Sequence, residues 1–216
     1  MVVSPSLTAI VAATIENGIG INGSLPWRLP REMKYFARVT TGSNPSSNPR
    51  DQNIVVMGRK TWESIPPKFR PLKSRRNFII STRGVDVQET ENTQVFGSLP
   101  SALSNLPTSA DSSRSFLIGG STLYNTCFTL SPNTSKPIVD RILLTRILTP
   151  FDCDTFLEDF TSHTYPNGKK VWKKSSHREL QQWIGWEEHE HLEEKGIKYK
   201  LEMWVLNEDE EIKERV

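Results

Sequence analysis

The chain has 216 residues, of which 36% are hydrophobic and 24% are charged. This length can bury a sizeable core and favours one domain over two, so we expect residues 1–216 to form a single domain without room for a second enzyme. The net charge of +2 is too small to indicate nucleic acid as the primary ligand, although a small charged substrate is compatible with it. The charges are interspersed, except in the acidic tail Glu208–Glu211.

The cysteines and histidines limit the compartment and the metal content. Cys127 and Cys153 cannot form a disulfide framework, which favours a reducing compartment. Neither cysteine lies in a metal-ligand motif, and His189-x-His191 is surrounded by glutamates as in a solvated loop, so no metal site is predicted. No basic leader precedes the N-terminal apolar run, which is too short to span a membrane. We therefore expect a cytoplasmic protein without a membrane segment, and nothing in the sequence demands more than a monomer.

Short apolar runs bounded by turn residues recur along the chain, with helical patterns between several of them. The predicted strands are Leu7–Ile15, Asn53–Met57, Asn77–Ser81, Gln94–Phe96, Ser115–Ile118, Val139–Ile147 and Ile197–Val205. The predicted helices are Pro30–Val39, Leu99–Leu106 behind a Ser98 cap, and Ser121–Phe128. The predicted surface loops are Thr40–Gln52, Pro107–Arg114, Thr129–Pro137 and Thr161–Gly168. This alternation of strands and helices is typical of an α/β protein.

The apolar patterns also separate two kinds of strand. The first five runs are apolar throughout, as is typical of strands that are buried on both faces. The last run alternates, with residues 197, 199, 201, 203 and 205 apolar on one side. It therefore predicts an antiparallel strand at or near a sheet edge.

A single acid, Glu32, lies at the start of the helix that follows a glycine-rich turn. Pro30 suits the first helical position, and Met33, Phe36 and Ala37 predict one buried stripe. Because Glu32 lies four residues before Phe36, its carboxylate should point to the apolar side of the helix. Burial would raise its pKa and the helix dipole would lower it, which leaves the direction open. An acid in the first turn of a helix can simply interact favourably with the helix dipole. A proton-handling role for Glu32 therefore needs support from other motifs.

The glycines Gly18-x-Gly20-x-x-Gly23 formally match the dinucleotide fingerprint. That fingerprint requires glycines that open a helix directly and an acid about 20 residues further on. Here Ser24–Trp27 follows instead, and Arg38–Pro49 holds no acid. We therefore reject a Rossmann site and interpret the glycines as a mobile loop or an ordinary turn.

Two further turns are suited to a phosphate-bearing ligand. In residues Met57–Trp62 a buried strand gives way to two cations at a helix start, where helix amides and Arg59 would attract phosphate oxygens. In residues Ile118–Tyr124 paired glycines would let the backbone approach a ligand. Both patterns also occur in turns without a ligand, and the basic loop Phe69–Arg76 alone is typical of a solvated surface.

Together, these motifs make the chain resemble the eukaryotic, and specifically the fungal, dihydrofolate reductases. The motifs run in order across nearly the whole chain, and their joint order is far more specific than any one of them. They are Ile10-Val-Ala12, Gly18-Ile-Gly20, Leu25-Pro-Trp27, Glu32 with Tyr35-Phe36, Met57–Pro66, Arg70-Pro-Leu-Lys73 with Arg75, Ile118-Gly-Gly120, Tyr124, Leu144-Thr-Arg146, Asp154-Thr-Phe156 and Lys195–Lys200. The resemblance implies a central mixed, mostly parallel, eight-stranded sheet flanked by helices, with an antiparallel C-terminal edge strand.

The resemblance also implies an activity, the NADPH-dependent reduction of 7,8-dihydrofolate to 5,6,7,8-tetrahydrofolate in one-carbon metabolism. Hydride would pass to pterin C6, and a proton would reach N5. Catalysis is assigned to Glu32, the single active-site acid, and to Trp27, which would order a water. Arg75 would bind the glutamate α-carboxylate of the substrate, and Thr145 would support Glu32. The remaining substrate-binding residues that the resemblance implies are Ile10, Val11, Met33, Phe36, Ser64, Ile65, Phe69, Leu72, Ile118 and Tyr124.

A second set of residues is implied for NADPH, divided among the nicotinamide, the pyrophosphate and the 2′-phosphate. Arg59 and the turn Ser81–Arg83 match the pocket of the 2′-phosphate, which would explain a preference for NADPH over NADH. The full set is Ala12, Ile19, Gly20, Gly23, Ser24, Gly58, Arg59, Lys60, Thr61, Ser81, Thr82, Arg83, Gly119, Gly120, Ser121, Thr122, Leu123 and Tyr124.

Some positions depart from the family pattern. Thr82 stands where the family commonly has arginine, so whether Arg59 or Arg83 meets the 2′-phosphate stays open. Ser74 replaces the usual glycine before Arg75 and should leave that arginine in place. The stretch 43–52 lacks family motifs and resembles a lineage-specific loop.

Two alternatives remain open. A riboflavin-pathway NADPH reductase of similar fold would lack Leu25-Pro-Trp27, the helix acid and the group Arg70–Arg75, all of which are present. A non-catalytic cofactor-binding or RNA-binding protein on the same scaffold is disfavoured by the intact Glu32 and Arg75 and by the weak net charge.

Overall fold

The structure is a computed structural model that describes residues 7–107, 113–130 and 138–207. The strands are β1 (Leu7–Thr14), β2 (Gly18–Gly20), β3 (Ile54–Gly58), β4 (Arg76–Ile80), β5 (Thr93–Phe96), β6 (Ser115–Leu117), β7 (Val139–Ile147), β8 (Thr155–Phe156), β9 (Trp172–Lys174), β10 (His191–Glu194) and β11 (Ile197–Leu206). The helices are α1 (Pro30–Thr41), α2 (Arg59–Ser64), α3 (Leu99–Leu103), α4 (Ser121–Leu130) and α5 (His177–Ile184). The predictions for the tail Glu208–Glu211 and for parts of the loops Pro107–Arg114 and Thr129–Pro137 lie outside the described residues.

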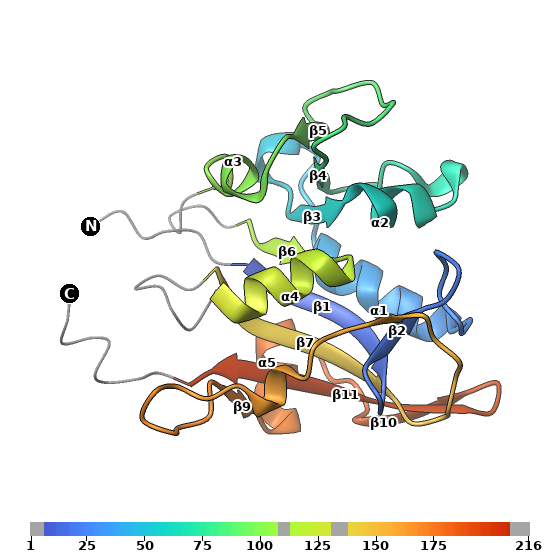
Figure 1. The fold of residues 1–216 in the computed structure, drawn as a ribbon. Helices are drawn as coiled ribbons and strands as arrows, with labels where there is room; N and C mark the ends of the chain where they lie inside the picture. Colours follow the sequence, from blue (N-terminus) through green and yellow to red (C-terminus); the bar gives the residue numbers. More distant parts are fainter. Residues whose placement is uncertain (1–6, 108–112, 131–137, 208–216) are drawn as a thin grey trace.

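One sheet carries most of the strands, in the order β10-β11-β7-β1-β6-β3-β4-β5, and the short β9 pairs with β11 as well (Figure 1). The pairs from β7 through β1, β6, β3 and β4 to β5 are parallel, whereas β11 is antiparallel to β7. The predicted mixed, mostly parallel sheet with an antiparallel C-terminal strand is confirmed. β11 lies one strand in from the edge, because the unpredicted β10 pairs with its outer side.

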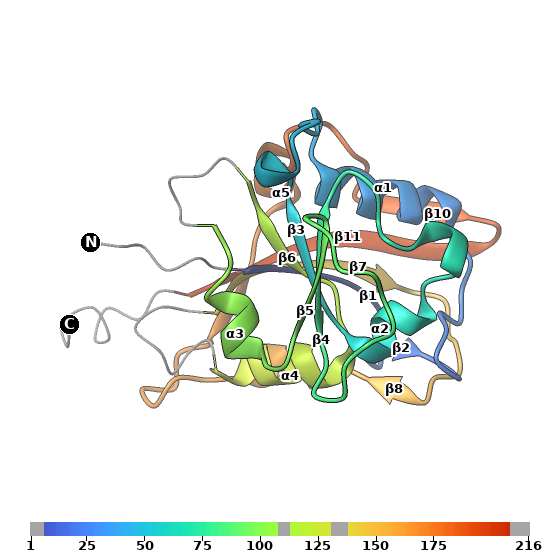
Figure 2. The ribbon, with the colours of Figure 1, turned by 90° about the horizontal axis from the view of Figure 1, so that it is seen from above.

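Helices cover both faces of this sheet, with α1 and α5 on one side and α3 and α4 on the other (Figure 2). The parallel strands are apolar throughout because both of their faces are buried; β3, for example, is buried at four of its five residues. Two hydrophobic clusters result, one between the sheet and each helical layer. No helix in the described part of the chain is long and apolar enough to cross a membrane.

Side chains that accept hydrogen bonds from backbone amides cap the starts of helices α3 and α5. The Ser98 side chain accepts a hydrogen bond from the amide of Ser101, so the predicted cap of α3 is confirmed. Helix α5 was not predicted, although Ser176 and Glu179 form a reciprocal capping box at its start. His191 begins β10, so the expected solvated loop around His189 and His191 is wrong at its second histidine.

The buried stripe predicted for α1 is also wrong in part. The buried side chains of this helix are Glu32, Tyr35, Val39 and Thr40. Met33 is 48% exposed. The stripe is shifted because one flank of the apolar surface faces a cleft rather than the sheet.

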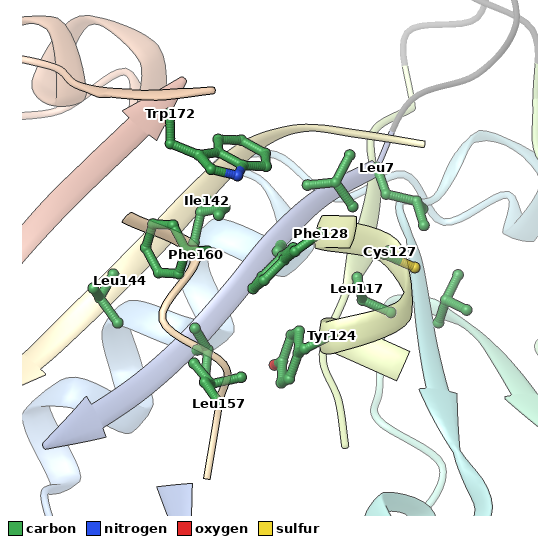
Figure 3. Packing of buried hydrophobic residues seen from close by; sticks show 14 of the residues in the cluster. Leu7, Leu117, Tyr124, Cys127, Phe128, Ile142, Leu144, Leu157, Phe160 and Trp172 are labelled. Carbon is green, nitrogen blue, oxygen red and sulfur yellow. The ribbon is translucent and has the colours of Figure 1, made fainter. Parts of the chain in front are cut away.

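Phe128 of α4 is the centre of an aromatic cluster on one face of the sheet (Figure 3). Its ring centroid lies 5.8 Å from Tyr124, 5.5 Å from Phe160 and 5.9 Å from Trp172. These rings come from three separate segments, and Phe128 itself is fully buried. The contacts with Phe160 and Trp172 are edge-to-face and that with Tyr124 is tilted, and such aromatic contacts add to the free energy gained by burial.

We expect Phe128→Ala to destabilise the fold by about 3–5 kcal/mol, because it removes a fully buried ring and leaves a cavity that the neighbouring aromatic side chains cannot fill. Urea unfolding measures the loss. The matched control is Phe156→Ala, because Phe156 is 47% exposed and its loss should cost at most about 1 kcal/mol. Equal effects of the two substitutions would contradict the assignment of Phe128 to the core.

Candidate active site

The candidate site lies at the edge of the sheet where the parallel strands end. Ala12 of β1 pairs with Thr145 of β7, and Gly58, the last residue of β3, pairs with Ile80 of β4. Because neighbouring parallel strands end at the same edge, the loops that follow them converge there. Segments far apart in sequence are thereby collected into one surface.

The two glycine turns predicted from the sequence meet at this edge. The amide of Gly58 donates a hydrogen bond of 2.7 Å to the carbonyl oxygen of Gly119. A Cβ atom at Gly119 or at Gly120 would come within 3.2 Å of the Thr61 hydroxyl oxygen, and Gly119 has a φ of +119°. The turns after β3 and β6 therefore form one surface in which glycine is required for close backbone approach.

Glu32 is a buried acid at the boundary between α1 and β7. It is 6% exposed, and the Thr145 hydroxyl donates a hydrogen bond of 3.1 Å to its Oε1. Burial raises the pKa of Glu32 to about 7; the bond from Thr145 opposes this shift, and the charge of Glu194 adds to it. The direction that the sequence left open is therefore upward. A carboxyl group with this pKa can hold or release a proton near neutral pH.

A cavity of about 240 Å³ lies beside this acid. Its lining residues are Leu25, Trp27, Arg28, Leu29, Pro30, Glu32 and Met33. Trp27 packs edge-to-face against Phe151, with ring centroids 5.6 Å apart. Its indole N–H is buried and has no hydrogen-bond partner among the described residues. A buried donor of this kind is costly unless a ligand or a water accepts from it.

Arg75 is a buried cation that contacts the C-terminal end of α1, whereas Glu32 lies at the start of that helix. Its Nη1 donates a hydrogen bond of 2.6 Å to the Thr40 hydroxyl, and its Nε donates to the Lys73 carbonyl at 3.0 Å. Burial lowers the pKa of Arg75 to about 10, so it stays charged at neutral pH. Within the described ranges no acid pairs with it, which leaves its charge available to an anionic ligand.

Two arginines were candidates for the 2′-phosphate, and they differ in their surroundings. Arg59 donates to both carboxylate oxygens of Glu63, at 2.7 and 2.8 Å. Arg83 has no ion pair in the part of the chain that the structure describes, and its backbone amide donates to the Ser81 hydroxyl. The Ser81 hydroxyl in turn donates to the Gly84 carbonyl, which fixes this turn.

The chain was then compared with known proteins. A family model of dihydrofolate reductase matches residues 6–184. The dihydrofolate reductase of Cryptococcus neoformans var. neoformans is 59% identical over 95% of this chain and 96% of its own length. That of Pneumocystis carinii is 39% identical over 93% and 96%. A bifunctional dihydrofolate reductase-thymidylate synthase of Arabidopsis thaliana is 42% identical over 72% of this chain and 27% of its own length.

The chain belongs to the dihydrofolate reductase family. The two relatives reported above that match over nearly the whole chain are fungal, which supports the fungal dihydrofolate reductase that the motifs indicated. Members of the family reduce dihydrofolate to tetrahydrofolate, so the chain is an oxidoreductase of folate metabolism.

The structure brings most of the residues implied for a dihydrofolate reductase site to this edge or to the cleft beside it. Ile10, Val11 and Ala12 lie on β1, and the Tyr124 hydroxyl donates to the Ile10 carbonyl at 2.6 Å. Met33, on α1, lines the cavity beside Glu32. Phe36 of α1 packs against the core cluster on this side of the sheet together with Ile65 and Leu72, which follow α2. Ser64 is the last residue of α2, and Phe69 is exposed in the segment after it.

The remaining cofactor-side residues lie on the turns that converge at the edge. Lys60 and Thr61 lie in the first turn of α2. Ile118, which the resemblance assigned to the substrate, leads from β6 into the paired glycines. Ser121, Thr122 and Leu123 open α4, and Thr82 is exposed in the turn after β4.

The glycine-rich loop before α1 contains the last of the residues implied for NADPH. Of these, Ile19 and Gly20 belong to β2. Gly23 and Ser24 follow in a turn closed by reciprocal backbone bonds of 2.9 Å between residues 21 and 24. No helix begins at these glycines, in agreement with the rejection of a Rossmann site.

Three supporting residues had no role assigned from the sequence, and Asp154 among them was noted only as part of a family motif. Thr40 accepts from Arg75 and donates to the Phe36 carbonyl. Asn77 bonds the backbone of the Arg75 loop on both sides, through Leu72 and Arg75. Asp154 accepts from the amide of Asn22 at 2.7 Å and so holds the glycine-rich loop to β8. Asn77 gave a detectable signal, since a lone amide side chain at the start of an apolar strand needs partners.

We expect Glu32→Gln to stabilise the protein above pH 7 by about 3 kcal/mol and to have little effect below pH 4.5. The folded protein binds the Glu32 proton more tightly than the unfolded chain, so stability falls as the pH rises from 4.5 to about 7. The amide has no proton to lose. Urea unfolding across this pH range measures the difference.

The control for this measurement is Glu16→Gln, since Glu16 is exposed. It should leave the pH dependence of stability unchanged. A Glu32→Gln protein that parallels the wild type at every pH would show that Glu32 does not carry a raised pKa.

Proposed function

We propose that the chain reduces 7,8-dihydrofolate with NADPH and that Glu32 manages the proton this reduction requires. The observation that carries the proposal is a lone carboxyl group, buried between α1 and β7 beside a cavity, with a pKa raised to about 7. Surface acids with ordinary pKa values are ionised at neutral pH and make poor proton donors. Here burial holds the proton, which suits a group that must assist protonation of pterin N5.

Glu32 acts within a small set of polar groups. The bond from Thr145 fixes its Oε1 and leaves Oε2 for the 2-amino group and N3 of the pterin. The buried indole N–H of Trp27 would donate to a water that relays the proton toward N5, which accounts for its lack of a partner among the described residues. Met33, Phe36, Ile65 and the other apolar residues of the cleft would exclude bulk water.

Arg75 would hold the other end of the substrate. Its guanidinium is charged, buried, held by Thr40 and without an acid partner in the described segments. A guanidinium binds a carboxylate through two parallel hydrogen bonds, so the glutamate α-carboxylate of the substrate suits it. The substrate would then be oriented by Glu32, at the start of α1, and by Arg75, which contacts Thr40 at the other end of that helix.

The residues at the sheet edge fit NADPH, which supplies the hydride when it is bound. Glycine at 58, 119 and 120 would let a ligand come close to the backbone, and the first amides of α4 would bind a pyrophosphate. Arg83, rather than Arg59, is the residue whose guanidinium is free of an acid in the described ranges. We infer that Arg83 meets the 2′-phosphate first and that Arg59 must share its charge with Glu63.

The remaining properties follow from the same proposal. One continuous sheet with a core on both faces supports a single dihydrofolate reductase domain over residues 1–216. Neither Cys127 nor Cys153 forms a disulfide among the described residues, in keeping with a reducing, cytoplasmic location. All of the site residues come from one chain, so a monomer suffices for the reaction.

We expect Glu32→Ala to lower turnover by roughly 10²–10⁴-fold, because it removes the group that manages the proton. The assay follows NADPH oxidation with and without dihydrofolate. The matched control is Lys34→Ala, on the exposed face of the same helix. Full activity of a folded Glu32→Ala protein would remove Glu32 from the mechanism, and a wild type that binds NADPH but ignores dihydrofolate would overturn the function.

We expect Arg75→Lys to raise KM for dihydrofolate by roughly 10–100-fold with little change in kcat, because a single ammonium cannot replace two parallel hydrogen bonds. Steady-state kinetics with dihydrofolate and with a dihydropterin that lacks the glutamate tail separate the two parameters. The tail-free substrate should be insensitive to the change. Lys73→Ala is the control, because Lys73 is exposed in the same loop. Equal losses with both substrates would contradict the assignment.

A further inference from the structure

The hairpin β10–β11 reaches across to the helix that carries Glu32. Glu194 is the last residue of β10 and pairs with Ile197 of β11. Lys195 and Gly196 between them have φ values of +53° and +78°, as in a tight two-residue hairpin turn. The turn places the Glu194 carboxylate at the start of α1, although 163 residues separate it from its partner there.

The start of α1 depends on this distant acid. The N-cap residue, Leu29, provides no side-chain hydrogen bond, and Pro30 has no N–H to donate. The amide of Arg31 donates to both oxygens of Glu194, at 2.9 and 3.2 Å. A carboxylate at this position also interacts favourably with the helix dipole. Glu194 therefore caps the N-terminus of α1, although it belongs to a distant part of the chain.

The charge of Glu194 acts on the proposed catalytic acid, since Glu194 binds the amide of Arg31, the residue before Glu32, and raises the pKa of Glu32. Glu188 is the other acid at this end of the helix, and its Oε1 pairs with the Arg31 guanidinium at 2.8 Å. Glu194 forms no ion pair among the residues that the structure describes. Its negative charge consequently opposes ionisation of Glu32, in addition to the effect of burial.

The neutral groups around Glu32 do not add negative charge beside it. Thr145 donates a hydrogen bond and opposes the rise. The phenols Tyr35, Tyr124 and Tyr199 have raised pKa values, chiefly because they are buried, and stay neutral at the pH of catalysis. The nearby charges are therefore those of Glu194, of the Arg31–Glu188 pair and of Arg28, which lines the cavity beside Glu32.

We propose that Glu194 is a positioning residue for Glu32, which anchors the first turn of α1 and whose negative charge adds to burial in keeping the nearby carboxyl group protonated. The inference rests on the proposed role of Glu32. It assigns a function to the C-terminal hairpin, which lies beyond the segment that the family model matches. The hairpin thereby adjusts the pH range in which the enzyme supplies protons.

Glu194→Gln separates the charge from the hydrogen bond, because the amide oxygen still accepts from the Arg31 amide. We expect unchanged turnover at low pH, a midpoint of the pH profile moved to lower pH, and roughly two- to fivefold lower turnover above that midpoint. Glu194→Asp retains the charge and should retain the midpoint. Glu194→Ala should combine the shifted midpoint with a higher KM and a lower urea midpoint, because it also removes the cap. Glu193→Gln, the exposed neighbour on β10, is the matched control and should leave the profile unchanged.

A second measurement keeps this inference separate from the proposed function. The Glu32 carboxyl carbon is titrated by ¹³C NMR in the wild type and in the Glu194 variants, without substrate, and Glu32→Gln identifies its signal. Titration at lower pH in Glu194→Gln and Glu194→Ala, but not in Glu194→Asp, would support the inference even in a protein without turnover. An unshifted Glu32 titration in Glu194→Gln would overturn it, and would do so without affecting the activity assigned to the enzyme.

Discussion

The burial of one carboxyl group against β7 is the constraint on which the site depends. Glu32 needs a hydrogen-bond donor and an apolar surrounding at the same time, and it obtains them from Thr145 and from the apolar side chains of α1 and its neighbours. This requires α1 to lie across the sheet with its first turn at the edge where the parallel strands end. The same placement brings the other end of α1, through Thr40, to Arg75. One helix therefore sets the distance between the proton-handling group and the anion-binding group.

Burial of a carboxyl group opposes stability, and the surrounding structure must offset that cost. Taking a carboxylate out of water is unfavourable, so above its raised pKa Glu32 weakens the folded state. A lone serine in the left-handed region is a second, smaller cost, since Ser74 has a φ of +58° beside Arg75. Asn77 offsets part of it by bonding the backbone around that residue. Costs of this kind concentrate at binding sites because the geometry there is set by the ligand.

The sequence predicted the elements whose signal is local. The apolar runs located β1, β3, β4, β5, β6, β7 and β11, and Pro30 and Ser98 located two helix starts, because burial on both faces and capping each leave a pattern within a few residues. Helix α5 was missed although Leu180, Trp183 and Ile184 have helical spacing and its capping box was present in the sequence, because the helix has only eight residues and its apolar pattern is short. The position of Glu32 was predicted, but its pKa was not, since desolvation depends on strands that lie far away in the chain.

Contacts between distant segments could not be predicted from the sequence, because no local pattern marks the residues that form them. The bond between Arg75 and Thr40 spans 35 residues, and that between Arg31 and Glu194 spans 163. Nothing in the composition around Thr40 or Glu194 distinguishes these residues from other polar side chains. Glu194 matters because the register of β11 with β7 and the tight turn at Lys195 bring a strand end to a helix start. Thr40 matters because the fold brings it to Arg75. A family resemblance transfers the residues that contact ligands, whereas the groups that tune them must be found from the geometry of the folded chain.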